Sequence, residues 1–262
     1  MRSIPEDNLA YPVLIKFDGT STGSGFNFRK DKFLYLVTAK HVLVNENNDL
    51  HGNEGSLVAY SPDSEDETPT VLKLNFENLM ANENIKLHST RDVAVIKIGE
   101  AEMAEELEMI SFNLLQNIVL ESSSERGIVW AGEEEILKYE EVLVSNEVII
   151  FGYPSSIGVP GSPQFDYDRP LIRKGIIASK YKQTNTIILD CPVYYGNSGG
   201  PVIQIEAITP VKRNYKIIGV VSQFVPYVEK WVNTKNGLTN TTFLNSGYSV
   251  AESIDNVLEL ID

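Results

Sequence analysis

The chain has 262 residues, of which 42% are hydrophobic and 22% charged, as is usual for a soluble globular protein with a sizeable core. Its net charge of −14 repels polyanions, so we expect it to bind neither nucleic acid nor anionic membranes. No apolar run has the length of a signal peptide or a membrane span, and the single cysteine excludes an intrachain disulfide. These features predict a cytoplasmic protein.

The first half consists of short β-rich runs separated by Gly, Asn, Asp and Pro, without heptads or a repeat of fixed period. The pattern predicts strands at residues 11–17, 25–28, 33–38, 57–60, 71–74 and 92–98. The acidic run at residues 63–67 is expected to be a solvated hairpin tip without chemistry.

The middle of the chain is less regular. Met103, Leu107 and Ile110 recur at helical spacing between glutamates, which predicts an amphipathic connecting helix over residues 100–112. Residues 114–141 give no clear pattern, and a spacer and a regulatory insertion are both open interpretations.

The second half returns to a β pattern and ends in an amphipathic segment. Strands are predicted within residues 142–153 and at residues 172–178, 186–189, 201–205 and 217–222. A terminal helix is predicted over residues 251–261, and loops over residues 155–170 and 225–245. The fold class is therefore mostly β, with two packed barrels, a connecting helix and a C-terminal helix. The expected units are a tail (1–10), an N-terminal barrel (11–98), a helical linker with the insertion (99–141), a C-terminal barrel (142–250) and a helix (251–262).

The turn at residues 196–201 reads Gly-Asn-Ser-Gly-Gly-Pro between two runs that resemble strands. Three glycines around Ser198 allow backbone angles that a Cβ forbids, and they leave the serine exposed beside bare N–H groups. An acyl-transfer nucleophile needs this arrangement, because the amides of Gly196 and Ser198 can then face the oxyanion. The alternative is a glycine-rich hairpin whose serine has no chemical role.

His41 follows the predicted strand at residues 33–38, where an imidazole can be presented into a cleft as the base for a serine hydroxyl. A structural histidine is the alternative, and His51 and His88 lie in polar stretches that are less rigid. Asp92 opens an apolar strand and can orient such an imidazole, or it can simply pair with Arg91.

Together these stretches resemble the chymotrypsin-like serine proteases, and among them the bacterial HtrA-type trypsin-like peptidases. The matching segments are residues 38–42 (Thr-Ala-Lys-His-Val), 92–98 (Asp-Val-Ala-Val-Ile-Lys-Ile) and 196–202, in the family order His, Asp, Ser. Weaker similarities lie at residues 23–26, 151–154, 175–178 and 218–222, whereas residues 114–141 are unmatched. The resemblance includes no PDZ domain, so it predicts neither trimerisation nor allosteric peptide sensing.

The resemblance implies two six-stranded β-barrels with a Ser-His-Asp triad in the cleft between them. Ser198 would be the nucleophile, His41 the general base and then acid, and Asp92 its orienting partner. The oxyanion hole would be the N–H groups of Gly196 and Ser198, with Asn197 between them. Because digestive relatives carry an aspartate at the position of Asn197, activation by propeptide cleavage is not implied.

The resemblance also implies a substrate-binding edge formed by Ser222, Gln223 and Phe224, which would pair with the peptide backbone by β-augmentation. Pro192 would lie at the base of the specificity pocket, where no acid is present to receive Lys or Arg. The ring of Phe224 would narrow that pocket and favour a small or medium apolar side chain. Cys191 is expected to be a buried core thiol rather than a nucleophile.

We therefore expect a serine endopeptidase that acts on protein or peptide substrates through an acyl-enzyme, without a cofactor or a metal. The alternative is a catalytically idle or latent trypsin-like module that binds peptides or partner proteins. An esterase on the same scaffold would use the same groups. A regulatory protein partner is expected at the insertion or at the loops of residues 155–170 and 225–245, while oligomeric state, substrate and trigger stay open.

Overall fold

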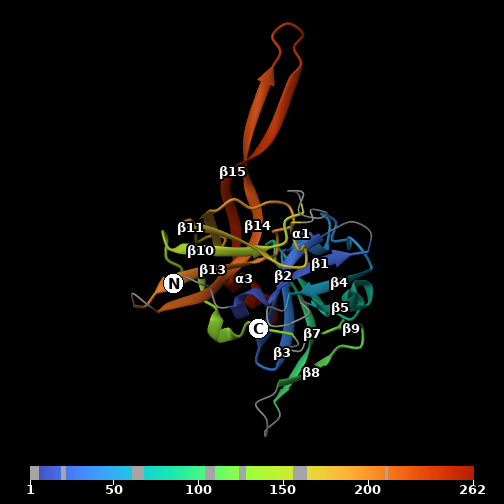
Figure 1. Ribbon diagram of the computed structural model, residues 1–262. Coiled ribbons are helices and arrows are strands. Elements are labelled where there is room, and N and C mark those ends of the chain that lie inside the picture. The colour runs from blue at the N-terminus through green and yellow to red at the C-terminus, as the bar shows by residue number, and fades with distance from the viewer. Residues whose placement is uncertain are drawn as a thin grey trace.

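The computed structural model describes residues 6–18, 22–60, 68–103, 110–123, 128–155, 164–209 and 212–262. The predicted acidic hairpin tip at residues 63–67 lies outside the described residues, as do residues 124–127 and 156–163. The remainder forms two antiparallel β-sheets with few helices, so the expectation of a mostly β fold in two halves is confirmed (Figure 1).

The first half is a nine-stranded sheet with the order β6-β7-β3-β2-β1-β4-β5-β9, and β8 pairs with β7. Its strands are β1 (Pro12–Phe17), β2 (Thr22–Lys30), β3 (Phe33–Thr38), β4 (Glu54–Ala59), β5 (Thr70–Asn75), β6 (Ile85–Leu87), β7 (Ala94–Met103), β8 (Ile110–Leu114) and β9 (Ile118–Ser122). Two short helices, α1 (Lys40–Leu43) and α2 (Phe76–Ala81), connect them, and a 3₁₀ turn (Glu6–Leu9) precedes them. Six strands were expected here, and the described strands do not close into a barrel.

The second half is a closed six-stranded barrel with the order β10-β11-β12-β15-β14-β13, as expected. Its strands are β10 (Glu147–Gly152), β11 (Leu171–Tyr181), β12 (Thr186–Asp190), β13 (Pro201–Ala207), β14 (Arg213–Val232) and β15 (Thr239–Ser253). The chain ends in α3 (Ile254–Ile261), whose N-terminus is capped by the Ser253 side chain. The helix begins three residues later than predicted because residues 251–253 complete β15.

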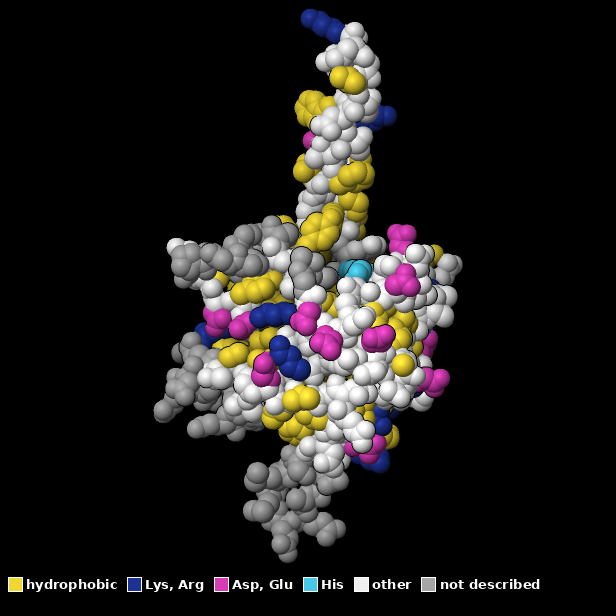
Figure 2. Space-filling model, turned by 90° about the vertical axis from the view of Figure 1, so that its right-hand side faces the viewer, with side chains coloured by type: hydrophobic (Ala, Val, Ile, Leu, Met, Phe, Trp, Pro, Cys, Tyr) yellow, Lys and Arg dark blue, Asp and Glu magenta, His cyan; other side chains and the backbone are white. Residues whose placement is uncertain are grey.

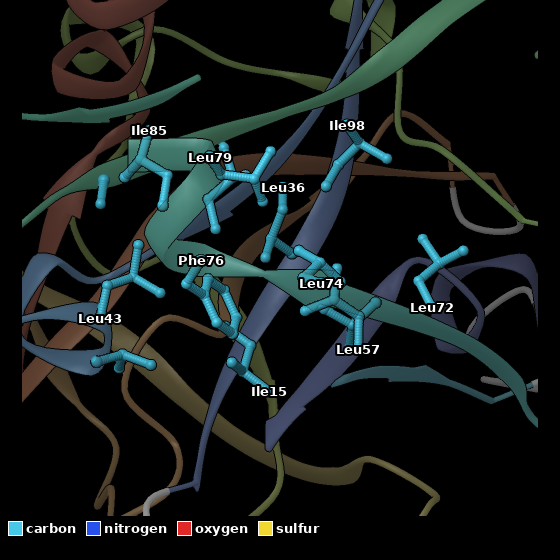
Figure 3. Packing of buried hydrophobic residues seen from close by; sticks show 14 of the residues in the cluster. Ile15, Leu36, Leu43, Leu57, Leu72, Leu74, Phe76, Leu79, Ile85 and Ile98 are labelled. Carbon is cyan, nitrogen blue, oxygen red and sulfur yellow. The ribbon is translucent and has the colours of Figure 1, made fainter. Parts of the chain in front are cut away.

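Three large apolar clusters and a small one around Tyr153 hold the described elements together. One fills the first sheet, where Phe76 and Leu79 of α2 point among the strand side chains (Figure 3). A second fills the second barrel and includes Cys191. The third lies between the halves and joins Phe26 of β2, Phe151 of β10 and Val257 of α3. The two sheets therefore share a continuous apolar contact, which fixes the relative position of side chains that they contribute to a common cleft.

The predicted helix over residues 100–112 is wrong where the structure describes it. β7 continues to Met103 and pairs with β8, with Gly99 opposite Leu114 and Met103 opposite Ile110. Glu100 is held by two lysines, Lys32 at 2.9 Å and Lys97 at 3.0 Å. The apolar spacing resembled a helix, but pairing across the sheet determined the conformation of these residues. Residues 118–122 of the uninterpreted stretch form β9, which pairs with β5.

The predicted loop over residues 225–245 is also wrong. β14 and β15 run on beyond the barrel and pair with each other from Pro226 opposite Asn245 to Val232 opposite Thr239. We call residues 226–245 the arm, and it projects from the body as a two-stranded ribbon (Figure 1). Among the described residues, no helix is both long enough and apolar enough to cross a bilayer.

Candidate active site

His41 and Asp92 are paired at the edge of the first sheet. His41 lies in α1 directly after β3, and Asp92 precedes β7, the neighbour of β3 in the sheet. Nδ1 of His41 is 2.8 Å from Oδ2 of Asp92, and the backbone N–H of His41 donates to Oδ1 at 3.0 Å. Both carboxylate oxygens therefore hold the histidine, and the Nδ1–H tautomer leaves Nε2 free to accept a proton.

Ser222 of β14 adds a third hydrogen bond to this carboxylate, because its hydroxyl donates to Oδ2 of Asp92 at 2.6 Å. Burial by itself would raise the pKa of Asp92. The hydrogen bonds from His41 and Ser222 outweigh that effect, together with the attraction of the imidazole, and hold the pKa below its ordinary value. Asp92 is thus an anion that the two halves of the molecule stabilise jointly.

The turn that carries Ser198 connects β12 to β13 of the second barrel. The N–H of Asn197 donates to the carbonyl of Tyr194 at 2.9 Å, and the side chain of Asn197 accepts from the N–H of Tyr194 at 3.0 Å. Gly196 occupies the third position of this turn with φ +94°, an angle that glycine adopts without strain. The side chain of Asn197, which is buried, therefore fixes the turn from inside.

The amides of Gly196 and Ser198 donate no hydrogen bond to any described residue. Three other amides of the turn are engaged, since Asn197, Gly199 and Gly200 each donate to a backbone carbonyl. The arrangement leaves two donors beside the Ser198 hydroxyl for an added acceptor, as a developing oxyanion requires.

Ser24 of β2 holds this turn from the other half of the molecule. Its buried hydroxyl donates to the carbonyl of Gly196 at 2.6 Å and accepts from the N–H of Tyr153 at 3.0 Å. Its backbone N–H donates to the carbonyl of Ser198 at 2.9 Å. The fit is close, because a Cβ on Gly199 would overlap the carbonyl oxygen of Ser24.

The Ser198 hydroxyl donates to the carbonyl of Ser222 at 2.9 Å. Among the hydrogen bonds of the described residues there is none between Ser198 and His41. In this structure the Ser198 hydroxyl is therefore bound to a backbone carbonyl of the strand edge that was predicted to bind substrate.

His41, Asp92 and Ser198 line one open cleft of about 710 Å³ together with Ser222, Gln223 and Phe224. Val193, Tyr194 and Tyr195 also line the cleft. The rings of Tyr195 and Phe224 pack edge to face, with their centroids 5.9 Å apart. Pro192 is half-buried and is not among the residues that line this cleft. The structure thus brings together all the predicted site residues at the cleft and its turn, apart from Pro192.

The chain matches the family model of the trypsin-like peptidase domain over residues 23–207. It belongs to the trypsin-like peptidase family. No curated protein sequence matches it significantly.

The fold of this trypsin-like peptidase is similar to those of HtrA-type proteases. The HtrA-type protease AlgW, solved with a tripeptide, is 15% identical and matches over 97% of this chain with a TM-score of 0.51. The crystal structure of Deg5 is likewise 15% identical over 97% of this chain, with a TM-score of 0.50, and 88% of the Deg5 chain is covered. The match covers 59% of the AlgW chain, so this chain spans less than two thirds of that relative.

The other candidate groups of the peptidase have structural partners. His88 is buried, and its Nδ1 accepts from the backbone N–H groups of Thr90 and Arg91 at 3.2 and 3.1 Å, which shapes the turn before Asp92. His51 contacts the carbonyl of His41 through Nε2 at 3.0 Å. Burial raises the pKa of the Cys191 thiol to about 11, so this side chain is a core residue. No cluster of three metal-ligating side chains occurs within the described ranges.

Sequence reasoning missed two residues, one that lines the cleft and one that holds the turn of Ser198. Glu252 of β15 lines the cleft and is buried, and Nδ2 of Asn256 donates to its carboxylate at 2.7 Å. Burial raises the pKa of Glu252 even though this hydrogen bond and nearby Arg91 oppose the effect. Ser24 lies in the Gly-Ser-Gly stretch at residues 23–25, which contributed to the family resemblance but gave no indication of the hydrogen bond to Gly196. Nothing in the sequence distinguishes Glu252 from a surface glutamate.

Proposed function

We propose that the chain is a serine endopeptidase in which Ser198 is the nucleophile, His41 the general base and Asp92 its orienting group. The observation that carries the proposal is the meeting in one cleft of a carboxylate-bound imidazole, a serine in a glycine turn and two amides free to donate. The family supports peptidase chemistry in general, and this geometry supports the serine mechanism in particular.

In the proposed reaction, Nε2 of His41 accepts the proton of Ser198 while Oγ forms a bond to the carbonyl carbon of the substrate. The negative charge moves to the carbonyl oxygen, which accepts hydrogen bonds from the N–H groups of Gly196 and Ser198. His41 then donates its proton to the leaving amine as the C–N bond breaks. A water molecule, deprotonated by His41, hydrolyses the acyl-enzyme and restores Ser198.

The proposed substrate is an extended polypeptide, whose backbone would pair with the edge formed by Ser222, Gln223 and Phe224. Pairing of a substrate N–H with the carbonyl of Ser222 would displace the Ser198 hydroxyl from that carbonyl and release it toward His41. The rings of Phe224 and Tyr195 narrow the cleft, which favours a small or medium apolar residue before the cleaved bond. Pro192 stays a predicted pocket residue, although it is not among the residues that line the cleft.

A latent peptide-binding module is the second candidate, and one observation favours it. The Ser198 hydroxyl is held by Ser222 and not by His41, so the nucleophile is not activated in the resting cleft. An enzyme whose substrate frees the hydroxyl and a module that never frees it share this resting geometry, and reactivity distinguishes them.

The experiment is labelling of the purified protein by a fluorophosphonate probe, with Ser198→Ala as the matched control. A competent enzyme labels in the wild type alone, because the probe needs both an activated serine and a formed oxyanion hole. Absence of labelling in folded wild type would reject the endopeptidase and support the latent module.

Asp92→Asn tests the orienting role separately. Asparagine keeps only one acceptor oxygen, and if the backbone N–H of His41 retains it, the new NH2 group faces Nδ1 and donates to it. The imidazole is then expected to adopt the wrong tautomer, with a loss of rate on the order of 10⁴-fold. That magnitude is the one known for the equivalent substitution in the chymotrypsin-like proteases. Hydrolysis of a chromogenic peptide measures it, with circular dichroism to verify the fold, and full activity in this variant would refute the assignment of Asp92.

A further inference from the structure

The arm is an unusual extension because neither of its faces is covered by another described element. Cross-strand pairs alternate between the faces, with Tyr227 opposite Leu244 on one and Val228 opposite Phe243 on the other. All four side chains are exposed, and apolar side chains follow the arm along its length (Figure 2). A two-stranded ribbon is marginally stable by itself, so apolar surface on both faces indicates a binding role.

One edge of the arm is continuous with the cleft. β15 pairs with β14 on one side to the end of the arm, whereas β13 pairs on the other side only as far as Val220. From Ser222 to Val232 no described strand pairs with this second edge. Its first residues, Ser222, Gln223, Phe224 and Pro226, line the cleft. The unpaired edge is therefore a template for an added strand, and it begins beside Ser198.

The orientation of the strand supports this use of the edge. The carbonyl of Val225 faces β15, because it accepts the hydroxyl of Ser246 at 2.6 Å. Successive residues of a strand alternate in direction, so the backbone groups of Pro226, Val228 and Lys230 face the open edge. Proline is tolerated where its missing N–H faces away from the neighbouring strand, which agrees with this assignment of Pro226.

The arm is also tied to the wall of the cleft. Nδ2 of Asn245 donates to the carbonyl of Val193 at 2.6 Å, and Val193 lines the cleft together with Phe224. The arm carries Glu229, Lys230 and Lys235, so it is slightly basic in a chain with a net charge of −14. A peptide that the acidic body repels is not repelled by the arm.

We propose that the arm prolongs the substrate-binding edge and binds, by backbone pairing along β14, the segment of an extended polypeptide that precedes the cleaved bond. This inference rests on the proposed function for its direction, since an antiparallel substrate runs from the tip of the arm toward Ser198. The occupant is a polypeptide without stable structure, neutral or acidic, with apolar residues at alternate positions, which lie on one face of the added strand beside the exposed apolar side chains of the arm.

The test measures peptide binding to Ser198→Ala protein by fluorescence anisotropy, so that cleavage does not interfere. The probes are fluorescein-labelled peptides of three, six and nine residues, with serine and valine alternating and valine at the C-terminus. A second nine-residue peptide carries N-methyl groups on alternate amides of its first six residues, which removes backbone pairing with the arm and keeps all the side chains and the three C-terminal residues. The protein is compared with a variant in which residues 229–242 are replaced by an Asn-Gly turn between the paired Val228 and Phe243.

We expect the dissociation constant to fall by about ten-fold from the three-residue to the nine-residue peptide with the full arm, and to stay constant with the shortened arm. The N-methylated peptide should bind like the shortest one. Val228→Pro removes one N–H that faces the open edge, so it should weaken binding of the nine-residue peptide, whereas Val228→Thr should not. These two variants replace the shortened arm as the test if the shortened protein does not fold.

Equal length dependence with and without the arm would overturn the inference. Loss of a dimer in light scattering when the arm is shortened, with no change in peptide binding, would overturn it in favour of contact between two copies. Fluorophosphonate labelling reports on the proposed function independently. If the protein is labelled but its affinity does not depend on peptide length, only the proposed role of the arm is rejected. If it is not labelled but its affinity does depend on peptide length, the arm keeps its role in a peptide-binding module.

Discussion

The turn at residues 196–201 and the arm are both glycine-containing connections of the second barrel, and they differ in what holds them. A Cβ at Gly199 would overlap Ser24 of the first sheet, whereas a Cβ at Gly237 in the arm would meet nothing within 4 Å. The turn is fixed by contacts from two sheets, and the arm only by its own ladder and its base. Tight constraint suits a group that must hold two amides in place, and an open ribbon suits a surface that adapts to many sequences.

The largest expected difference is between two Gly→Ala variants, one in the turn of Ser198 and one in the arm. Gly199→Ala forces a side chain into a φ of +89° against Ser24 and Thr38, and we expect destabilisation of at least about 3 kcal/mol and loss of fluorophosphonate labelling. Gly237→Ala has a φ of +71° in open space, so it should cost about 1 kcal/mol and leave labelling intact. Chemical denaturation and labelling measure both, and equal effects of the two variants would refute the comparison.

Ser24→Ala addresses the contact between the first sheet and the turn. It leaves the carbonyl of Gly196 and the N–H of Tyr153 without a partner, which costs about 1–3 kcal/mol for each buried group. Because Gly196 carries one of the two free amides, we expect the labelling rate to fall by about 10- to 100-fold as well.

Ser253→Ala is the matched control for Ser24. Ser253 is equally buried and caps α3, and its loss should cost about 1 kcal/mol without changing the labelling rate. A Ser24 variant that loses stability but keeps its full labelling rate would show that Ser24 supports the fold and does not position the turn.

The contrast between the turn and the arm also explains what the sequence could predict. His41, Asp92 and Ser198 follow from local patterns, a strand end and a glycine turn, whose geometry depends on few neighbours. The arm does not, because Tyr227, Trp231 and Phe243 are interspersed with Asn, Thr and Lys in a stretch typical of a loop. Only the pairing of β14 with β15 makes that stretch a ribbon.

The other errors and omissions have the same origin. Residues 100–103 belong to a segment whose apolar residues have helical spacing, but they pair with β8. Ser24 and Glu252 lie beside residues that are far away in the sequence. Five strands of the second barrel were predictable because they alternate with clear turn residues, whereas β15 covers residues predicted in part as a loop and in part as a helix. The first sheet gained β8 mainly from the end of the predicted connecting helix, and β9 from the stretch without a recognisable pattern.

The smallest expected effect distinguishes the buried base of β15 from the exposed arm by pH. The raised pKa of Glu252 means that the folded chain binds this proton more tightly than the unfolded chain, whose value is near the ordinary 4.5. The free energy of unfolding should therefore fall as the pH rises from about 4.5 through the folded pKa, since the unfolded state loses the proton first. Glu252→Gln removes that loss, so its stability relative to wild type should increase across this window and stay constant above it.

Glu229→Gln makes the same change of charge on the arm. Glu229 lies opposite Thr242 in the ribbon, away from Asp92 and the cleft, so we expect this variant to follow wild type at each pH. Thermal unfolding at several pH values between 4 and 8 compares the three proteins. If Glu252→Gln and Glu229→Gln shift the unfolding temperature in parallel, the effect belongs to the net charge of the chain and not to a buried acid beside Asp92. A divergence confined to Glu252→Gln would assign the pH dependence to the cleft, where burial opposes the ionisation of Glu252.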